Sequence, residues 1–310
     1  MSGARMLMVP DGLAGERVDV GLARMTGLSR SRVADLIDQG HVEVDGSVPA
    51  RSTRLEPGAM VSVTIPDERP AAEVRPRIAE GMALVHQDDD IVVIDKPVGV
   101  AAHPSAGWSG PTVLGHLAAA GVSIRTTGDP ERQGIVSRLD VGTSGLMVVA
   151  RNEGAYTTLK DAFRAREVDK TYHAVCQGRP DQPRGTIEAP IGRSPHHDYK
   201  FAVTREGKHS VTHYETLEEL RGATLLRIKL ETGRTHQIRV HFSAMHHPLV
   251  GDTMYGADPT VGERLGLNRQ WLHAMELGFV HPGTGQYVTY SSRYPEDLQH
   301  ALEALRASSE

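Results

Sequence analysis

The sequence contains little of what several common classes of protein require. Cys176 is the single cysteine among 310 residues, so the chain can form no intramolecular disulfide and no zinc site of paired cysteines. No apolar run approaches the roughly 20 residues that a membrane-spanning helix needs. The apolar part of the N-terminal segment is too short for a signal peptide. We therefore expect a cytoplasmic protein without a membrane partner.

Motifs of several large enzyme classes are absent from the sequence as well. It contains no P-loop and no G-x-G-x-x-G fingerprint, which removes support for nucleotide hydrolysis and for dinucleotide-dependent redox chemistry. A G-x-S-x-G nucleophile elbow is also missing. α/β-Hydrolase chemistry therefore has no support either.

An excess of basic residues is the third feature that the sequence lacks. Lys and Arg number 34 against 39 Asp and Glu, a net charge of −5, whereas nucleic-acid-binding domains are usually basic. However, 28 of these 34 residues are Arg, whose planar guanidinium pairs with phosphate and stacks on bases. Codon bias is the alternative explanation. The distribution of Arg along the chain is therefore more informative than the total.

The length indicates two or three domains, and we assign the first to residues 15–66. Two short helices are expected there, the second with Ser29 as its N-cap and Gly40 at its end. Two stretches of valine alternating with polar residues follow, with Asp45–Gly46 as a turn. This domain is predicted to be a small α/β unit with a hairpin-based sheet.

Prolines and charges predict a linker at residues 67–80. In the second domain, 81–310, predicted strands outnumber predicted helices and short loops join them. This pattern predicts an α+β fold, with a mixed, mostly antiparallel sheet and helices packed on it. We expect strands at 82–85, 91–95, 135–138, 146–150, 170–176, 210–216 and 224–231, and helices at 155–163 and 235–245.

One candidate site lies in GIVSRLDVGTSGLMVVA, residues 134–150. Asp140 follows a predicted strand and precedes a glycine-rich turn, a placement that is common for catalytic groups. The alternative is an Asx turn in which Asp140 caps its own loop. Arg138 would share a face with Asp140 if the strand continued, so it could pair with the carboxylate or bind a phosphate.

A second candidate site lies in LETGRTHQIRVHFSAMHHPLVGDTMYG, residues 230–256. Arg234 and Arg239 fall on different faces of either a helix or a strand, so we expect different roles for them. A metal site is disfavoured, because the histidines do not share one helix face and have no acidic partner among them. Elsewhere, Tyr172 in KTYHAV is a core or a catalytic aromatic, and His103 lies in a loop suited to line a cleft.

The first domain resembles the S-four RNA-binding domain in the stretch SRSRVADLIDQGHVEVDG. In that family this stretch forms the helix and hairpin that rest on structured RNA. Arg30 and Arg32 lie at the start of the predicted helix, where free backbone N–H groups add to the positive charge. The resemblance implies that both contact RNA, and the alternative is a solvated helix start.

Nearly the whole chain resembles an RNA pseudouridine synthase of the RluA/RluD type. The matching pieces occur in the family's order: DKPVGVAAHPS, SRLDVGTSGLMVVA, KTYHA, ETGRTHQIRVHF, HPLVGDTMYG and RQWLHAMELGFVHP. The resemblance implies the pseudouridine synthase fold for the second domain. Ser137 departs from the family, in which His commonly precedes R-L-D.

The resemblance also implies roles for single residues. Asp140 would be the catalytic aspartate and Arg239 its salt-bridge partner. Tyr172 would stack on the target base and assist proton transfer, with Ile238 on the other side of the base. Arg138 would enter the RNA and hold the nucleotide flipped out, an event that costs a few kcal/mol. Phosphate contacts would come from Arg30, Arg32, Arg138 and Arg234.

Pseudouridine is an isomer of uridine, so the implied reaction needs no cofactor, no metal and no second substrate. The two-domain layout implies ribosomal RNA of the large subunit as the substrate, with transfer RNA as the alternative, and nothing in the pattern requires more than a monomer. Two other classes stay open at this point. One is an RNA-binding module without catalysis, and the other is a glycosidase, which usually needs two carboxylates.

Overall fold

The structure is a computed structural model. Contacts divide the chain into two units, Met1–Ala71 and Ala72–Glu310, each with its own hydrophobic core. Ser29, the predicted N-cap, lies outside the described residues. Within the described part of the chain no helix is long and apolar enough to cross a membrane. The described residues are 4–28, 30–65, 74–105, 107–126, 132–195, 197 and 199–307.

The first unit combines two helices with a small antiparallel sheet. Its elements are β1 (Ala4–Met8), α1 (Val18–Thr26), α2 (Arg30–Asp38), β2 (Val42–Val44) and β3 (Met60–Thr64). The strands follow the order β1-β3-β2. The sequence analysis predicts both helices and the two later strands but not β1, which precedes the predicted start of the domain.

Alternating valines explain how this sheet carries its helices. Val61 and Val63 on β3 are fully buried and belong to one core cluster with Leu36 of α2. After β2 the chain reverses through Asp45 and Gly46, whose φ angles are 48° and 78°. Two successive positive φ angles are typical of a type I′ turn, and it lies where the sequence predicts a turn.

The second unit is built on one large sheet. Its strands are β4 (Ala83–Gln87), β5 (Ile91–Lys96), β6 (Ser144–Ala150), β7 (Asp169–Gln177), β8 (Arg184–Glu188), β11 (Val211–Leu220), β12 (Ala223–Leu230), β13 (Leu272–Val280) and β14 (Tyr287–Ser291). They follow the order β4-β5-β6-β13-β7-β12-β11-β8, with β14 beside β13. Only the β13–β6 pair is parallel among the described strands of this sheet. This confirms the predicted α+β fold with a mixed, mostly antiparallel sheet.

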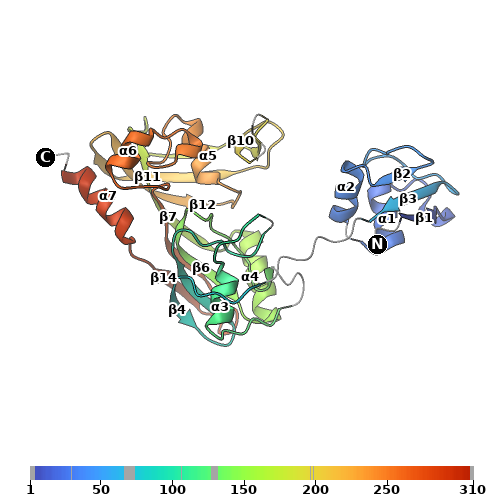
Figure 1. Ribbon diagram of the computed structural model, residues 1–310, viewed down its shortest axis with the longest axis horizontal. Coiled ribbons are helices and arrows are strands. Elements are labelled where there is room, and N and C mark those ends of the chain that lie inside the picture. The colour runs from blue at the N-terminus through green and yellow to red at the C-terminus, as the bar shows by residue number, and fades with distance from the viewer. Residues whose placement is uncertain are drawn as a thin grey trace. The chain divides into compact units, whose positions relative to one another are not determined.

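Helices cover both faces of this sheet, as Figure 1 shows. On β5, Val92 and Ile94 point into the core cluster of α3, whereas Ile91 and Val93 point into that of α4. Tyr172 contacts both the α3 and the α5 clusters, so these two helices share a face. The other face carries α4 and α7. The bounds are α3 (Val113–Ala119), α4 (Glu153–Ala165), α5 (Gln237–Ala244), α6 (Pro259–Arg264) and α7 (Glu296–Ala307).

Several predictions for the second unit need correction. The strand expected at 135–138 does not form, and a single bridge from Ile135 to Val149 stands in its place. Gly134, with a φ of 72°, ends a turn just before this bridge, and the chain bends again at Ser137, so the pairing does not continue. The helix expected from 235 begins at Gln237. The sequence analysis also does not predict α3, α6, α7, β8, β13, β14 or the separate pair of β9 (Ile191–Arg193) and β10 (Phe201–Val203).

Candidate active site

Asp140 lies in the loop that leads into β6, on the face of the sheet that carries α3 and α5. The backbone N–H of Thr143 donates to the Asp140 carbonyl at 3.0 Å, which closes a tight turn. The side chain is 21% exposed, so its carboxylate is half-buried but accessible to a ligand. The turn thus holds Asp140 out of the sheet and towards the start of α5.

Two side chains from the beginning of α5 face this carboxylate. Arg239 Nη1 lies 3.6 Å from Asp140 Oδ2, and His236 Nε2 lies 3.8 Å from Oδ1. His236 has a φ of 56° and precedes the helix. Burial lowers the pKa of His236, although the charge of Asp140 raises it in part, so the imidazole is neutral near pH 7. Of these two side chains, only the Arg239 guanidinium therefore faces Asp140 as a cation.

Asp252 holds Arg239 more closely than Asp140 does. Arg239 Nε donates to Asp252 Oδ2 at 2.7 Å, and Nη2 donates to Oδ1 at 2.8 Å. Both side chains are buried, and the guanidinium carbon lies 4.7 Å from the centre of the Tyr255 ring. This bidentate pair leaves Nη1 directed at Asp140, because planar guanidinium geometry fixes the remaining N–H groups.

Gln237 fixes the loop that delivers Arg234 and His236. Its Oε1 accepts from Thr232 Oγ1 at 2.7 Å and from the Arg234 backbone N–H at 3.0 Å. Its Nε2 donates to the Val211 carbonyl at 2.9 Å. A buried amide with its hydrogen bonds satisfied makes the loop rigid.

A second brace holds the loop of Asp140 from the other side. Arg269 forms a bidentate pair with Asp297 at 2.6 and 2.9 Å, and its Nη1 donates to Ser144 Oγ at 3.1 Å and to the Gly142 carbonyl at 3.3 Å. Gln270 Nε2 donates to Thr143 Oγ1 at 3.2 Å. The segment RQW and helix α7 therefore position the loop of Asp140, which neither segment reveals by its own sequence.

Lys96 holds the loop that follows β5, which lies against a third side of the turn of Asp140. Its side chain is fully buried, and Nζ donates to the carbonyls of Pro97 at 3.0 Å and Val100 at 2.9 Å. Burial lowers the pKa of Lys96 to about 7, against the opposing charge of Asp140. This loop is hydrogen-bonded to the turn of Asp140, because the Gly99 N–H donates to the Val141 carbonyl at 2.9 Å.

Asp140 lies at a narrow neck between two larger cavities. The neck has a volume of about 60 Å³ and is lined by Asp140, Tyr172, Ile238 and Arg239. A cavity of about 800 Å³ opens on the side of Tyr172, and one of about 420 Å³ opens on the side of Met254. The three spaces share lining residues and form one cleft. A base at the neck would meet Tyr172, whose pKa burial raises, so its phenol is neutral.

The structure brings most of the predicted site residues to this cleft. Asp140, Tyr172, Ile238 and Arg239 line the neck, as do Arg138 and Arg234 at its rim. A hydrogen bond from the Arg138 guanidinium to Thr235 Oγ1 joins the two sides of this rim. His103 lines both larger cavities. The predicted pair of Asp140 and Arg239 is present, with Asp252 as a closer partner of the same guanidinium.

Arg30 and Arg32 belong to the first unit. Arg30 Nη2 lies 3.0 Å from Asp19 Oδ2, and Arg17 also pairs with this carboxylate, at 2.9 Å to Oδ1. These two Arg side chains lower the pKa of Asp19, Arg17 more strongly than Arg30, so the carboxylate stays charged. Arg30 is thus held at the start of α2 with 62% of its side chain exposed.

Sequence reasoning missed Asp252, His236 and Lys96 as parts of the site. Asp252 had a usable signal, because it and Glu231 are the two acidic residues of the Arg- and His-rich segment 230–256. Lys96 had a weaker signal as one of six lysines in a chain that prefers Arg. The contact of His236 depends on its left-handed backbone, which no spacing rule predicts.

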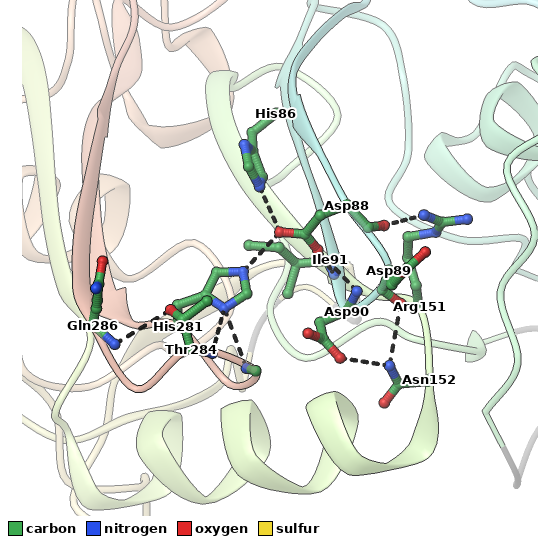
Figure 2. Close-up of polar contacts among 11 residues, drawn as sticks. His86, Asp88, Asp89, Asp90, Ile91, Arg151, Asn152, His281, Thr284 and Gln286 are labelled. Atoms are coloured by element: carbon green, nitrogen blue, oxygen red, sulfur yellow. Dashed lines mark hydrogen bonds and ion pairs between the residues drawn. The ribbon is translucent and has the colours of Figure 1, made fainter.

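A second cluster, at the turn between β4 and β5, has the residue types of a metal site. His86 Nε2 and His281 Nε2 lie 2.7 and 2.8 Å from Asp88 Oδ2, as Figure 2 shows. However, His281 Nδ1 accepts the backbone N–H groups of Gly283 and Thr284, both at 3.2 Å. A neutral imidazole that accepts at Nδ1 carries its proton on Nε2, so this nitrogen donates to Asp88. The cluster therefore fits a hydrogen-bonded clamp better than a metal site.

Comparisons with known proteins agree with this geometry. Residues 90–244 match the family described as RNA pseudouridylate synthase, and residues 16–61 match the S4 domain. An uncharacterized RNA pseudouridine synthase of Mycobacterium bovis is 59% identical over 302 residues, 97% of this chain and 98% of the relative. Ribosomal large subunit pseudouridine synthase D of Xanthomonas campestris pv. campestris is 39% identical over 318 residues, 99% of this chain and 94% of the relative.

Among solved structures, human RNA Pseudouridylate Synthase Domain Containing 1 has a TM-score of 0.57 and 27% identity, over 75% of this chain and 98% of its own. The fold and the cleft thus define an enzyme that modifies RNA. More particularly, the chain belongs to the RNA pseudouridylate synthase family of the RluA/RluD type, with an N-terminal S-four domain. It is an isomerase, and the predicted class of enzyme and its pseudouridine synthase fold are confirmed.

Proposed function

We propose that Asp140 is the carboxylate that acts on the target uridine. The observation that supports this best is its position at the neck of the cleft, between Tyr172 and the Arg239 guanidinium. A guanidinium keeps its proton in proteins, so it stabilises the carboxylate charge in a half-buried site. Asp252 cannot serve as a second acid, because both of its oxygens accept from Arg239. This arrangement supports isomerisation better than a two-carboxylate hydrolysis.

Tyr172 and Ile238 would hold the uracil ring from its two sides. Ile238 is 4% exposed and lines the neck with Tyr172. The raised pKa of Tyr172 makes phenolate scarce near pH 7, so stacking and hydrogen bonding by the neutral phenol fit the site better than proton removal. Stacking on an aromatic contributes about 1–3 kcal/mol per base, which offsets part of the cost of flipping the nucleotide.

Arg138 would fill the place of the flipped nucleotide in the RNA. Its hydrogen bond to Thr235 spans the rim of the neck. The neck is much smaller than the cavities beside it, so this bond lies across the way in for a base. A base can enter after this bond opens, and the freed guanidinium is then next to the RNA. Arg234 and His103 would position the neighbouring phosphates and sugars.

The substrate that the relatives favour is ribosomal RNA of the large subunit. Relatives named ribosomal large subunit pseudouridine synthase D match 97–99% of this chain at 39–40% identity. The first unit, with Arg30 and Arg32 at the start of α2, would anchor this RNA a second time and raise its effective concentration at the cleft. Such a substrate places the reaction in the cytoplasm, and a monomer suffices for it.

Mapping of pseudouridine in total RNA tests this proposal. RNA from cells with and without the gene is labelled with carbodiimide and read by primer extension, and loss of a signal in large-subunit ribosomal RNA is expected. Purified enzyme should restore that signal on a transcript of the same region. Loss confined to transfer RNA would overturn the assignment of the substrate, and release of free uracil would overturn the isomerisation.

A further inference from the structure

The cavity of about 800 Å³ beside Asp140 has more positive charge than isomerisation requires. Its lining has six cationic and two acidic side chains, in a chain whose net charge is −5. A local excess of this kind attracts a polyanion even when the whole protein is acidic. The cations are Arg132, Arg138, Arg164, Arg166, Lys170 and Arg234, and the acids are Glu231 and Glu276.

Three of these cations form a group that we call the α4–β7 corner: Arg164, Arg166 and Lys170. Arg164 lies in the last turn of α4, Arg166 caps this helix with a φ of 65°, and Lys170 lies at the start of β7. All three line the large cavity and none lines the neck at Asp140. The corner is therefore separate from the reacting groups but opens into the same cleft.

Acidic side chains hold two of these cations loosely. Arg166 Nη1 lies 2.9 Å from Glu231 Oε2, and Arg164 Nη1 lies 2.7 Å from Asp161 Oδ1. All four side chains are at least 40% exposed. Exposed pairs of this kind contribute little to stability, so a phosphate can replace the carboxylate at little cost.

We infer that the α4–β7 corner is a phosphate subsite for the RNA strand that continues from the target uridine, and that Glu231 competes with that strand for Arg166. The inference rests on the proposed function, in which the uridine enters the neck at Asp140. Tyr172, Arg138 and Arg234 line both the neck and the large cavity, so a strand with its base at the neck continues directly into this space. A phosphodiester is the ligand that a row of guanidinium and ammonium groups on an open wall recognises.

Removal of the corner charges provides the first test. The variant Arg164→Gln/Arg166→Gln/Lys170→Gln is titrated with a fluorescein-labelled hairpin transcript of the mapped region, at several salt concentrations. Each lost phosphate contact lowers the slope of log K against log salt by about 0.7–0.9, so a fall of about 2 is expected together with weaker binding. The value of kcat at saturating RNA should stay within about twofold, because the corner does not touch the reacting atoms. Arg179→Gln is the control, because Arg179 is exposed, pairs with Glu219 at 2.8 Å and does not line the cleft.

The variant Glu231→Gln provides a test of opposite sign. It frees Arg166 for phosphate and is expected to tighten RNA binding by about three- to tenfold at low salt. A gain of affinity cannot result from misfolding, so this variant decides the question if the triple variant unfolds. Glu219→Gln, which frees Arg179 outside the cleft, should leave affinity unchanged.

The outcomes separate this inference from the proposed function. If the wild type modifies the transcript but neither the triple variant nor Glu231→Gln changes Kd or the salt slope, the subsite is refuted and the proposed function stands. If the wild type binds the transcript but modifies no uridine in it, the proposed function fails and the inference falls with it. A parallel loss of kcat in the triple variant would contradict a pure binding role.

Discussion

Asp140 is the side chain on which the proposed reaction depends most. Asp140→Asn keeps the size and the hydrogen bonds of the turn but removes the charge, so we expect pseudouridine formation to be lost and RNA affinity to stay within a few-fold. A tritium-release or carbodiimide assay measures the first quantity, and filter binding measures the second. Asp181→Asn, an exposed residue outside the cleft, is the control. Turnover by Asp140→Asn near the wild-type rate would reject this role.

Asp252 is expected to matter for stability as well as for turnover. The variant Asp252→Ala lacks the carboxylate that pairs with Arg239, so the buried guanidinium has no bidentate partner. Loss of one partner of a buried ion pair costs about 3–5 kcal/mol of unfolding free energy. Urea denaturation measures this loss. Asp140→Asn keeps the Arg239–Asp252 pair and should change the unfolding free energy by less than about 1 kcal/mol.

At the scale of elements, the clamp at Asp88 ties two turns of the sheet together. Oδ1 accepts the backbone N–H groups of Asp90 and Ile91 at 2.8 and 2.9 Å, while Oδ2 contacts His86 and His281. Burial opposes the negative charge, but these hydrogen bonds outweigh it and lower the pKa of Asp88. The contacts join the β4–β5 turn to the segment that follows β13 (Figure 2).

The variant Asp88→Asn should lose about 1–3 kcal/mol of unfolding free energy at neutral pH. Because the folded pKa is lowered, the charge stabilises the fold above the unfolded pKa near 4, and this contribution is lost as the pH falls towards the folded pKa. The difference between wild type and Asp88→Asn should therefore be full above about pH 5 and shrink towards pH 2. Urea denaturation at a series of pH values measures it, with the exposed Asp89→Asn as the control. A difference independent of pH would refute this account.

At the scale of the whole molecule, the second unit should fold without the first. Residues 74–80, the described part of the predicted linker, contact the second unit: Val74 and Ala79 pack in the α3 cluster, and the Ala79 N–H donates to His116 Nδ1 at 3.1 Å. A cut after Ala71 preserves these contacts.

Deletion of residues 1–71 should therefore leave one cooperative unfolding transition and weaken RNA binding by roughly 10–100-fold, since a second anchor raises effective concentration. Calorimetry and filter binding measure the two effects. The full chain with Arg30→Gln and Arg32→Gln is the matched comparison and should lose a part of the same affinity. Unchanged affinity of the deleted chain would remove the first unit from the binding site.

Local pattern predicts a large part of the elements. Alternating valines predict β3, helical spacing predicts α2 and α4, and the Asp45–Gly46 pair predicts its turn, because period and turn chemistry act over neighbouring residues. The prediction of a strand at 135–138 is wrong for a reason that the pattern of neighbouring residues does not contain. A turn at Gly134 precedes the bridge at Ile135 and a bend at Ser137 follows it, so a single bridge forms in place of a strand.

The sequence by itself determined the family of this protein, its two helix-and-sheet units and the identity of Asp140, Tyr172 and Arg239 as candidates, because those signals reside in contiguous motifs. Only the tertiary structure decided that Asp252 holds Arg239 and that Arg269 and Lys96 brace the turn of Asp140. The tertiary structure also places the cations of α4, β7 and the loop before α5 around one cavity. Contacts of this kind join residues far apart in the chain, and strand order and helix packing bring them together.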